Sequence, residues 1–269
     1  MLLYKYLGRQ DFFSNFKLRI TPPNELNDPR ECIPEIRLKD PRGYISNVVQ
    51  RNFESGYFRL LFENPRLTPQ QALDACLKAS SLIEDDFHTN NDAWIKRIFD
   101  TVMNVTNRNV GILSLSETYN NELMWSHYAN SHNGFVVGFD IDNAFFKPKK
   151  DDPKVCGELM NVQYSDSAPL VYVEPGKFEI PKELFFTKTT KWSYEREWRM
   201  IKLLTSATEV VGSTIHLFEV PPEAVKEVIF GIKVNDKTRG QIESLLQPSA
   251  SHVTFRKASL NHRGEFNVA

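Results

Sequence analysis

The chain has 269 residues, of which 41% are hydrophobic and 25% are charged. This composition is ordinary for a soluble protein and is sufficient to bury a core of full size. Lysine and arginine total 33 against 34 for aspartate and glutamate, so no global positive charge favours a nucleic acid or a membrane as partner.

The cysteines Cys32, Cys76 and Cys156 lie far apart and form no CxxC pair. An odd number of separated cysteines argues against a disulfide framework and a structural zinc site, and is typical of a reducing compartment. The N-terminal apolar run is too short for a secretory signal, and no run of about 18 apolar residues occurs. We therefore expect a cytoplasmic protein with no membrane partner.

The first half of the chain predicts strands, short helices and one helical block. Residues 2–6 predict a strand, "QDFFSNF" a short helix, and "KLRITPPNELNDPRE" a strand that runs into a proline-rich loop. Between about 44 and 107 the apolar residues follow helical spacing. Then "NVGILSLSE" predicts a buried strand, "NNELMWSHYANSH" a helix, and "NGFVVGFDI" a strand after an Asn-Gly turn.

The second half predicts mostly strands, in "CGELMNVQYS", "EREWRMIKLL", "TIHLFEV", "VKEVIFGI" and "HVTFRKASL". The segment "IPKELFFTKTTKW" predicts a helix entering a loop, and "DKTRGQIESLLQ" a helix capped by Asp236. The whole pattern predicts an α+β fold in a single domain, residues 1–269, with an antiparallel or mixed sheet and a helical insertion at about 44–107.

Two glutamates lie two positions apart in "EREWRMI". If this segment is a strand, Glu195, Glu197 and Arg199 share one face, with neighbours about 6.5–7 Å apart. Carboxylates this close raise each other's pKa unless a cation offsets them, and Arg199 is placed to do so. If the segment is a helix, Glu195 and Arg199 form an exposed ion pair worth a few tenths of a kcal/mol. Spacing alone favours the exposed ion pair.

The segment "LSLSETYNNELMWSHYANSH" is dense in polar and aromatic residues and resembles a pocket wall. Its two histidines, His127 and His132, are five positions apart, which disfavours a metal site on one helical face. A serine with a histidine would fit acyl transfer, but no GxSxG elbow occurs. Packing in the core is the simpler interpretation of Trp125 and Tyr128. No GxGxxG follows a strand and no GxxxxGK[ST] occurs, so neither a Rossmann site nor a P-loop is indicated.

Five segments together resemble a widespread bacterial family known as domain of unknown function 2971. They are "YKY", "TPPNELNDPRE", "LSLSETYNNELMWSHYANSHNGFVVGFD", "TKTTKWSYEREWR" and "EVIFGIKV". The resemblance spans nearly the whole chain, and "LMWSHYA" and "WSYEREWR" are its most specific parts. It implies little about biochemistry, because a shared family or fold does not define a function.

The order of elements also resembles the ADP-ribosyltransferase superfamily, whose members bind NAD across a split antiparallel sheet. The "ERE" segment matches the ExE pattern of that superfamily, which implies that Glu197 is catalytic and that Glu195 steers the acceptor. Lys5 stands where an Arg or His is more usual, and no STS triplet occurs. The residues assigned to NAD binding are Lys5, Tyr4, Tyr6, Asn27, Asp28, Ser114, Ser116, Trp125, Tyr128 and Arg199.

This resemblance favours a functional role for the two glutamates over the exposed ion pair. It implies an NAD-dependent ADP-ribosyltransferase-like enzyme that modifies a macromolecule, nucleic acid or protein, as toxins and phage-defence effectors do, with an antitoxin protein as a candidate partner. The alternative is a non-catalytic ligand-binding or sensor module of a defence system, in which "NDPRE" and "LMWSHYANSH" line the pocket. A third hypothesis, a nuclease or other hydrolase, requires a divalent ion.

Overall fold

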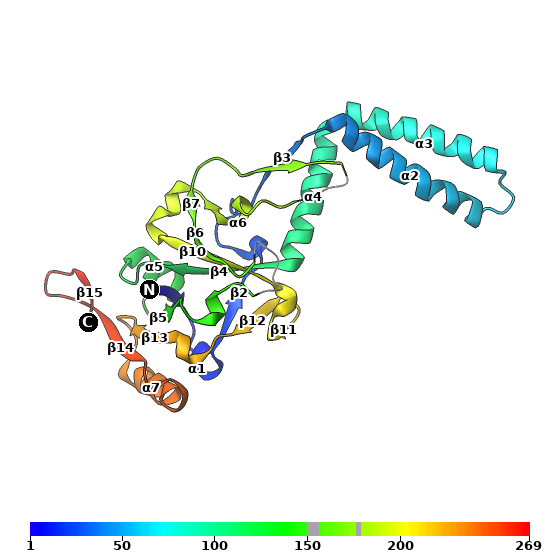
Figure 1. Cartoon of the computed structure of the whole chain (residues 1–269). Helices are drawn as coiled ribbons and strands as arrows, with labels where there is room; N and C mark the ends of the chain where they lie inside the picture. Colours follow the sequence, from blue (N-terminus) through cyan, green and yellow to red (C-terminus); the bar gives the residue numbers. More distant parts are fainter. Residues whose placement is uncertain (150–155, 176–178) are drawn as a thin grey trace. The chain divides into compact units, whose positions relative to one another are not determined.

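The chain divides into two compact units, shown in a computed structural model that describes residues 1–149, 156–175 and 179–269. Unit 1 comprises residues 1–32, 106–167 and 185–269, and unit 2 comprises residues 33–105 and 168–184. Figure 1 shows the elements of both units. The expectation of a single domain with an insertion stays a prediction.

An eight-stranded mixed sheet forms the centre of unit 1 in the described part of the chain. Its order is β15-β14-β13-β5-β1-β4-β10-β6, and only β13 and β14 pair in parallel. The strands are β1 (Leu2–Leu7), β4 (Val110–Ser116), β5 (Phe135–Asp140), β6 (Leu159–Asn161), β10 (Glu197–Leu203), β13 (Val225–Phe230), β14 (Thr254–Leu260) and β15 (Phe266–Val268). The prediction of an α+β fold is confirmed.

The central strands β1 and β4 diverge after a single paired position. β1 pairs with β4 at one position, Tyr4 with Ser116, whereas β1 follows β5 along its whole length and β4 follows β10. Beyond that single pair, backbone groups of β1 and β4 have no ladder between them. The unpaired backbone groups of β1 and β4 at this divergence therefore need other hydrogen-bond partners, such as side chains.

The other elements of unit 1 surround this sheet. The strands β11, β12 and β2 form a small antiparallel sheet, and β7 pairs with β9 in parallel. These elements are α1 (Phe12–Asn15), β2 (Lys17–Ile20), η1 (Pro23–Glu25), α5 (Glu122–Tyr128), η2 (Ala144–Phe146), β7 (Gln163–Tyr164), β9 (Thr187–Lys188), η3 (Thr190–Glu195), η4 (Leu204–Ser206), β11 (Glu209–Val211), β12 (Ile215–Glu219), η5 (Pro222–Ala224) and α7 (Asp236–Ala250).

Successive side chains of a strand point to opposite faces of the sheet, and each face of the large sheet carries a buried apolar cluster. Leu3 and Val137 belong to the apolar cluster that packs against α1 and α7. Tyr4, Tyr6 and Val136 belong to the cluster on the opposite face, which includes residues of α5. The central strand β1 therefore contributes to two cores.

One capping prediction is wrong. Helix α7 begins at Asp236, but its N-cap is Asn235, whose side chain accepts a hydrogen bond from the backbone N–H of Thr238 at 2.8 Å. Asn and Asp are similarly good caps, so residue type alone does not distinguish Asn235 from Asp236. The extended backbone at Asn235 decides between them.

Unit 2 contains the helical block. It consists of α2 (Pro41–Glu63), α3 (Pro69–Thr89), most of α4 (Asn91–Asn109), and a parallel pair of strands, β3 (Glu35–Leu38) and β8 (Leu170–Val173). The short helix α6 (Glu183–Phe186) spans the boundary between the units in sequence. None of the described helices is both long and apolar enough to cross a membrane.

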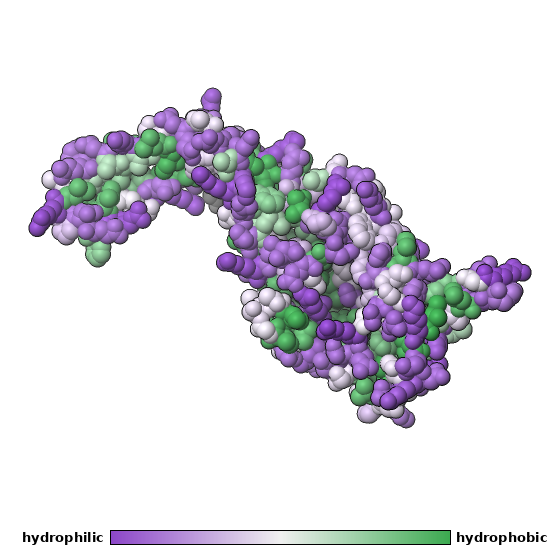
Figure 2. Space-filling view, turned by 180° about the vertical axis from the view of Figure 1, so that it is seen from behind, coloured by the Kyte–Doolittle hydropathy of each residue, from purple (hydrophilic) through white to green (hydrophobic). Residues whose placement is uncertain are grey.

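The helices α2 and α3 lie side by side as a hairpin (Figure 1). Each begins at a capped residue: the Asp40 side chain accepts from Gly43, and Thr68 forms a reciprocal capping box with Gln71. Phe58 and Phe62 are exposed on α2. In the space-filling view, small hydrophobic areas on the hairpin are separated by hydrophilic ones (Figure 2), so the hairpin presents no continuous apolar face there.

Candidate functional site

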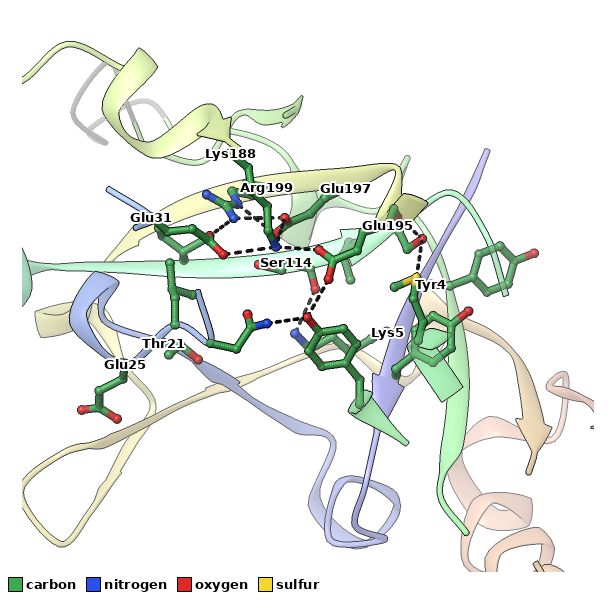
Figure 3. A pocket seen from close by; sticks show the side chains of 18 residues that line it. Tyr4, Lys5, Thr21, Glu25, Glu31, Ser114, Lys188, Glu195, Glu197 and Arg199 are labelled. Carbon is green, nitrogen blue, oxygen red and sulfur yellow. Dashed lines mark hydrogen bonds and ion pairs between the residues drawn. The ribbon is translucent and has the colours of Figure 1, made fainter. Parts of the chain in front are cut away.

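A cavity of about 220 Å³ lies in unit 1 and is lined by β1, β4, β10 and the loop after β2. It lies where β1 and β4 diverge. Figure 3 shows acidic and basic side chains converging there. The lining residues are Tyr4, Lys5, Tyr6, Thr21, Glu25, Leu26, Asn27, Glu31, Ile112, Ser114, Leu115, Ser116, Met124, Tyr128, Lys188, Glu195, Glu197 and Arg199.

Glu197 is the first residue of β10 and is buried in the cavity wall. Its Oε1 accepts from Nε of Arg199 at 2.8 Å, and its Oε2 accepts from Nη2 of Arg199 at 3.0 Å. This two-point contact is the strong form of an arginine–carboxylate pair. The backbone N–H of Glu197 donates to the hydroxyl of Tyr164 at 2.8 Å, which fixes the start of the strand.

Arg199 is fully buried and every part of its guanidinium has a partner. Besides Glu197, its Nη1 donates to the carbonyl oxygen of Phe185 at 2.8 Å and its Nη2 contacts Glu31. Its position two residues after Glu197 on β10 confirms that these two side chains share a strand face. Since Arg199 is fully buried and each of its three guanidinium nitrogens donates to a protein oxygen, it holds the carboxylates in place and is not presented to a ligand phosphate in this arrangement.

Lys188, on β9, joins three carboxylates from different segments. Its Nζ lies 3.1 Å from Glu31, 2.6 Å from Glu195 and 3.1 Å from Glu197. It also lies 4.9 Å from the ring centroid of Trp192, in a cation–π arrangement. Lys188 is thus the shared counter-ion of the cluster.

The expectation that Glu195 shares a strand with Glu197 is wrong. Glu195 ends the 3-10 helix η3, and Arg196 follows it with a left-handed backbone (φ 45°) before β10 begins. The turn at Arg196 replaces strand alternation, yet both carboxylates meet at Lys188. The alternative of an exposed helical ion pair between Glu195 and Arg199 is also wrong, because both side chains are buried and Arg199 lies on β10.

Tyr128 and Asn27 form a short hydrogen-bond chain to Glu195. The Tyr128 hydroxyl donates to Oε1 of Glu195 at 2.6 Å, and Nδ2 of Asn27 donates to the Tyr128 hydroxyl at 2.7 Å. Asn27 is exposed and lies in the loop predicted from the Pro-Pro and Asn-Asp-Pro sequence. The chain therefore connects Glu195 to the more accessible edge of the cavity.

The pKa values of the two glutamates are shifted in opposite directions. Burial alone would raise the pKa of Glu197, but the charges of Arg199 and Lys188 and hydrogen bonds from Arg199 and Ser114 lower it to about 2. Burial raises the pKa of Glu195 above its ordinary value, against the opposing effect of Lys188. Neighbouring groups with pKa values moved apart are a common arrangement in sites that exchange protons. Glu197 stays ionised, and Glu195 takes up a proton first as the pH falls.

Lys5 lies on β1, where β1 and β4 diverge. It is half-buried on β1, and its Nζ donates to the backbone carbonyl oxygen of Ser114 on β4 at 2.9 Å. Burial lowers the pKa of Lys5 to about 8, against the opposing charges of Glu197 and Glu195. This contact replaces part of the missing ladder between the two strands.

The serines and tyrosines assigned to binding have different degrees of access. Ser114 is half-buried, while Ser116 is buried and donates to the backbone carbonyl oxygen of Glu195 at 2.6 Å. Tyr4 and Tyr6 line the cavity but are also largely buried, and the Tyr6 hydroxyl donates to the carbonyl oxygen of Thr118 at 3.0 Å. Ser114 is therefore the more accessible of the two serines.

Two residues assigned to NAD binding do not line the cavity. Trp125 is fully buried, and its Nε1 donates to the carbonyl oxygen of Tyr119 at 2.8 Å. Asp28 is buried and accepts hydrogen bonds from Thr189 at 3.3 Å and from the backbone N–H of Arg30 at 2.9 Å. Trp125 packs in the core and Asp28 stabilises its loop by hydrogen bonds, so neither side chain is placed to stack on or bind a ligand in this cavity.

Sequence reasoning missed Lys188 and Glu31. Both belong to quoted segments, "TKTTKWSYEREWR" and "TPPNELNDPRE", but nothing in their spacing connects residue 31 with residue 188. The available signal was physical: a buried pair of carboxylates requires cationic partners nearby, and Arg199 could serve only part of them. In the described part of the chain, no cluster of three or more His, Cys, Asp or Glu side chains is arranged to hold a metal ion.

Comparison with known proteins assigns part of the chain to a family. The family model described as protein of unknown function (DUF2971) matches residues 124–200. The matched segment includes Tyr128, Lys188, Glu195, Glu197 and Arg199, and excludes β1 and β4. No curated protein and no solved structure matches the chain, so these comparisons give no support to the resemblance to ADP-ribosyltransferases. What they establish is a DUF2971 domain over residues 124–200.

Proposed function

We propose that this protein is an NAD-dependent enzyme of the ADP-ribosyltransferase type, which cleaves the bond between nicotinamide and ribose and transfers ADP-ribose to a nucleic acid or a protein. One observation carries the proposal. An ionised carboxylate, Glu197, and a carboxyl group with raised pKa, Glu195, lie together in the wall of a cavity at a parting between two central strands.

Each glutamate suits one half of this reaction. When the C1′–N bond breaks, its electron pair leaves with nicotinamide and C1′ develops positive charge, which a fixed carboxylate such as Glu197 stabilises in a site that excludes water. The acceptor nucleophile then bonds to C1′ and releases a proton. Glu195, with its raised pKa, is the better proton acceptor of the two.

The size and charge of the cavity limit which part of NAD it takes. Its volume of about 220 Å³ is below the roughly 300–1,000 Å³ typical of pockets for drug-sized ligands. The nicotinamide riboside half would enter, where carboxylates favour a cationic ring and accept hydrogen bonds from ribose hydroxyls. The pyrophosphate would remain near Lys5, because Arg199 is fully buried and each of its guanidinium nitrogens already donates to a protein oxygen.

The competing proposal is a non-catalytic ligand-binding or sensor module. A specific observation favours it: both oxygens of Glu197 and both oxygens of Glu195 already accept hydrogen bonds from neighbouring side chains. In that case the cluster holds β9, β10 and the loop after β2 together, and Glu197 performs no chemistry. A transferase requires some of these contacts to exchange for substrate hydroxyls when NAD binds.

The two proposals separate in one experiment with Glu197→Gln. Wild type, this variant and the exposed control Glu122→Gln are incubated with labelled NAD and cellular RNA, DNA and protein, and thermal melts are recorded in parallel. A transferase loses nicotinamide release in Glu197→Gln but not in Glu122→Gln, and the label identifies the acceptor class. Unchanged turnover in a folded Glu197→Gln variant overturns the transferase proposal. Absence of turnover in wild type, with a lower melting temperature for Glu197→Gln, favours the sensor module.

A further inference from the structure

Lys5 differs from the other cations of the cavity in its partners. Lys188 and Arg199 form direct ion pairs with carboxylates. Among the described residues, Lys5 has one hydrogen bond, to the neutral carbonyl oxygen of Ser114, and no ion pair. Its amine is therefore held in the cavity by a contact that does not require a positive charge.

The surroundings of Lys5 favour its neutral form more than those of an exposed lysine do. Burial removes water from the ammonium group and Lys188 repels it, while the charges of Glu197 and Glu195 oppose these effects only in part. With a pKa of about 8, about one amine in ten is unprotonated at pH 7, against about one in 2,500 for an unperturbed lysine of pKa ≈ 10.4. A desolvated lysine next to a second cation is a known way to activate an amine as a nucleophile.

The neighbours of Lys5 supply what an amine needs to react with a carbonyl group. Lys5, Ser114 and Glu195 all line the cavity (Figure 3). Glu195 carries a raised pKa and can give and take a proton. The carboxylates and Tyr128 offer hydrogen-bond partners to hydroxyl groups.

We propose that Lys5 is a nucleophilic amine that forms an imine with a small hydroxylated aldehyde, such as an open-chain sugar, that enters the cavity. The lone pair of Nζ attacks the carbonyl carbon and the C=O π electrons move to oxygen, giving a carbinolamine. One proton passes from Nζ to that oxygen and Glu195 donates a second, so the oxygen leaves as water while the Nζ lone pair forms the C=N bond. The remaining proton of the iminium then returns to Glu195, which leaves the neutral imine. The reaction consumes no oxidant or reductant and is independent of the proposed cleavage of NAD.

The test is trapping with glyceraldehyde and sodium cyanoborohydride, which reduces the imine to a stable secondary amine. The intact wild-type protein is treated at pH 7, and peptide mass spectrometry follows labelling at Lys5 and at the exposed lysines Lys191 and Lys237 in the same sample. We expect Lys5 to react at least about tenfold faster, because its unprotonated fraction is higher by about two orders of magnitude and lower basicity offsets only part of that gain. Its rate should level off above about pH 8.

Two variants complete the test. Lys5→Arg keeps a cation in the cavity but cannot form an imine, so the rapid label should disappear, whereas the exposed control Lys191→Arg should keep it. Labelling of Lys5 no faster than that of Lys191, or a rate that continues to rise to pH 10, overturns the proposal. The comparison within wild type decides the question even if Lys5→Arg fails to fold. Since no NAD is present, a negative result here is distinct from an absence of NAD turnover.

Discussion

Replacing Lys188 with methionine should strongly destabilise unit 1. The substitution keeps most of the side-chain volume and removes the charge that lies 2.6–3.1 Å from Glu31, Glu195 and Glu197. Removing one partner of a buried ion pair typically costs about 3–5 kcal/mol, because the remaining charge stays buried without compensation. Arg199 still pairs with Glu197 and Glu31, although its single charge offsets only one of them, and Glu195 loses the one cation that forms an ion pair with it among the described residues.

Hydrogen exchange at β4 and β10 measures this loss within unit 1 alone, which matters because a chain of two compact units need not unfold in one step. A cost of 3–5 kcal/mol corresponds to amide exchange about 10²–10⁴-fold faster for amides that exchange through unfolding of the unit. The matched control is Lys191→Met, an exposed lysine of η3, whose cost should stay within about 0.5 kcal/mol.

The deficit of Lys188→Met should also depend on pH. Glu195 already has a pKa above its ordinary value of 4.5, and loss of Lys188 raises that pKa further. A carboxyl group with a raised pKa in the folded protein binds its proton more tightly there, so folding loses stability as the pH rises from 4.5 toward the folded-state pKa. The difference from wild type should therefore be smaller at pH 5 than at pH 8. Exchange rates within about twofold of wild type, or a deficit that is constant between pH 5 and 8, would refute this reasoning.

Three further substitutions test separate parts of the structure. Tyr128→Phe removes the hydroxyl that donates to Glu195 at 2.6 Å, so it should lower the free energy of unfolding in urea by about 1.5–3 kcal/mol. It should also raise the pKa of Glu195 in a carboxyl NMR titration, and an unchanged titration contradicts the assignment of this hydrogen bond. Thr68→Ala removes the capping box of α3 and should cost about 0.5–2 kcal/mol, seen as earlier melting of helical circular dichroism. Gly134→Ala places a Cβ 2.2 Å from the backbone oxygen of Leu7. Because the backbone cannot move aside as a flexible side chain does, the substitution should lower the free energy of unfolding by at least the roughly 1–3 kcal/mol of overpacking. Stability close to that of wild type would contradict this close contact.

Periodicity predicted the elements that have long or strongly alternating patterns. The helical spacing between about 44 and 107 corresponds to α2, α3 and α4, and the apolar runs correspond to β4, β5, β10 and β13. The short strands β3, β8, β11 and β15 were not predicted. They have three or four residues each, which is too short for alternation to be distinguished from loop composition.

The sequence predicted several residues of the site, but neither Lys188 and Glu31 nor the contacts that join the members of the cluster. The ExE pattern led to Glu195 and Glu197, which do meet in one cavity, but through the turn at Arg196 and the counter-ion Lys188. A left-handed residue between two glutamates is invisible to a period-of-two argument, because arginine shows no general preference for that backbone. Glu31 joins the cluster from 168 positions away from Arg199, a distance that only the tertiary fold can close.

The charge balance of the cavity distinguishes residues that stabilise the cluster by ion pairs from residues that can change protonation state. With Glu31, Glu195 and Glu197 ionised, Lys188 and Arg199 leave the directly paired cluster with one uncompensated negative charge (two positive, three negative). Either a proton on Glu195, the ammonium form of Lys5 or a cationic group of a ligand can balance it. The first two are the groups whose pKa values move toward neutrality, whereas Glu197 stays ionised. We therefore expect Lys5 and Glu195, and not Glu197, to exchange protons with a ligand if the cluster is a reactive centre.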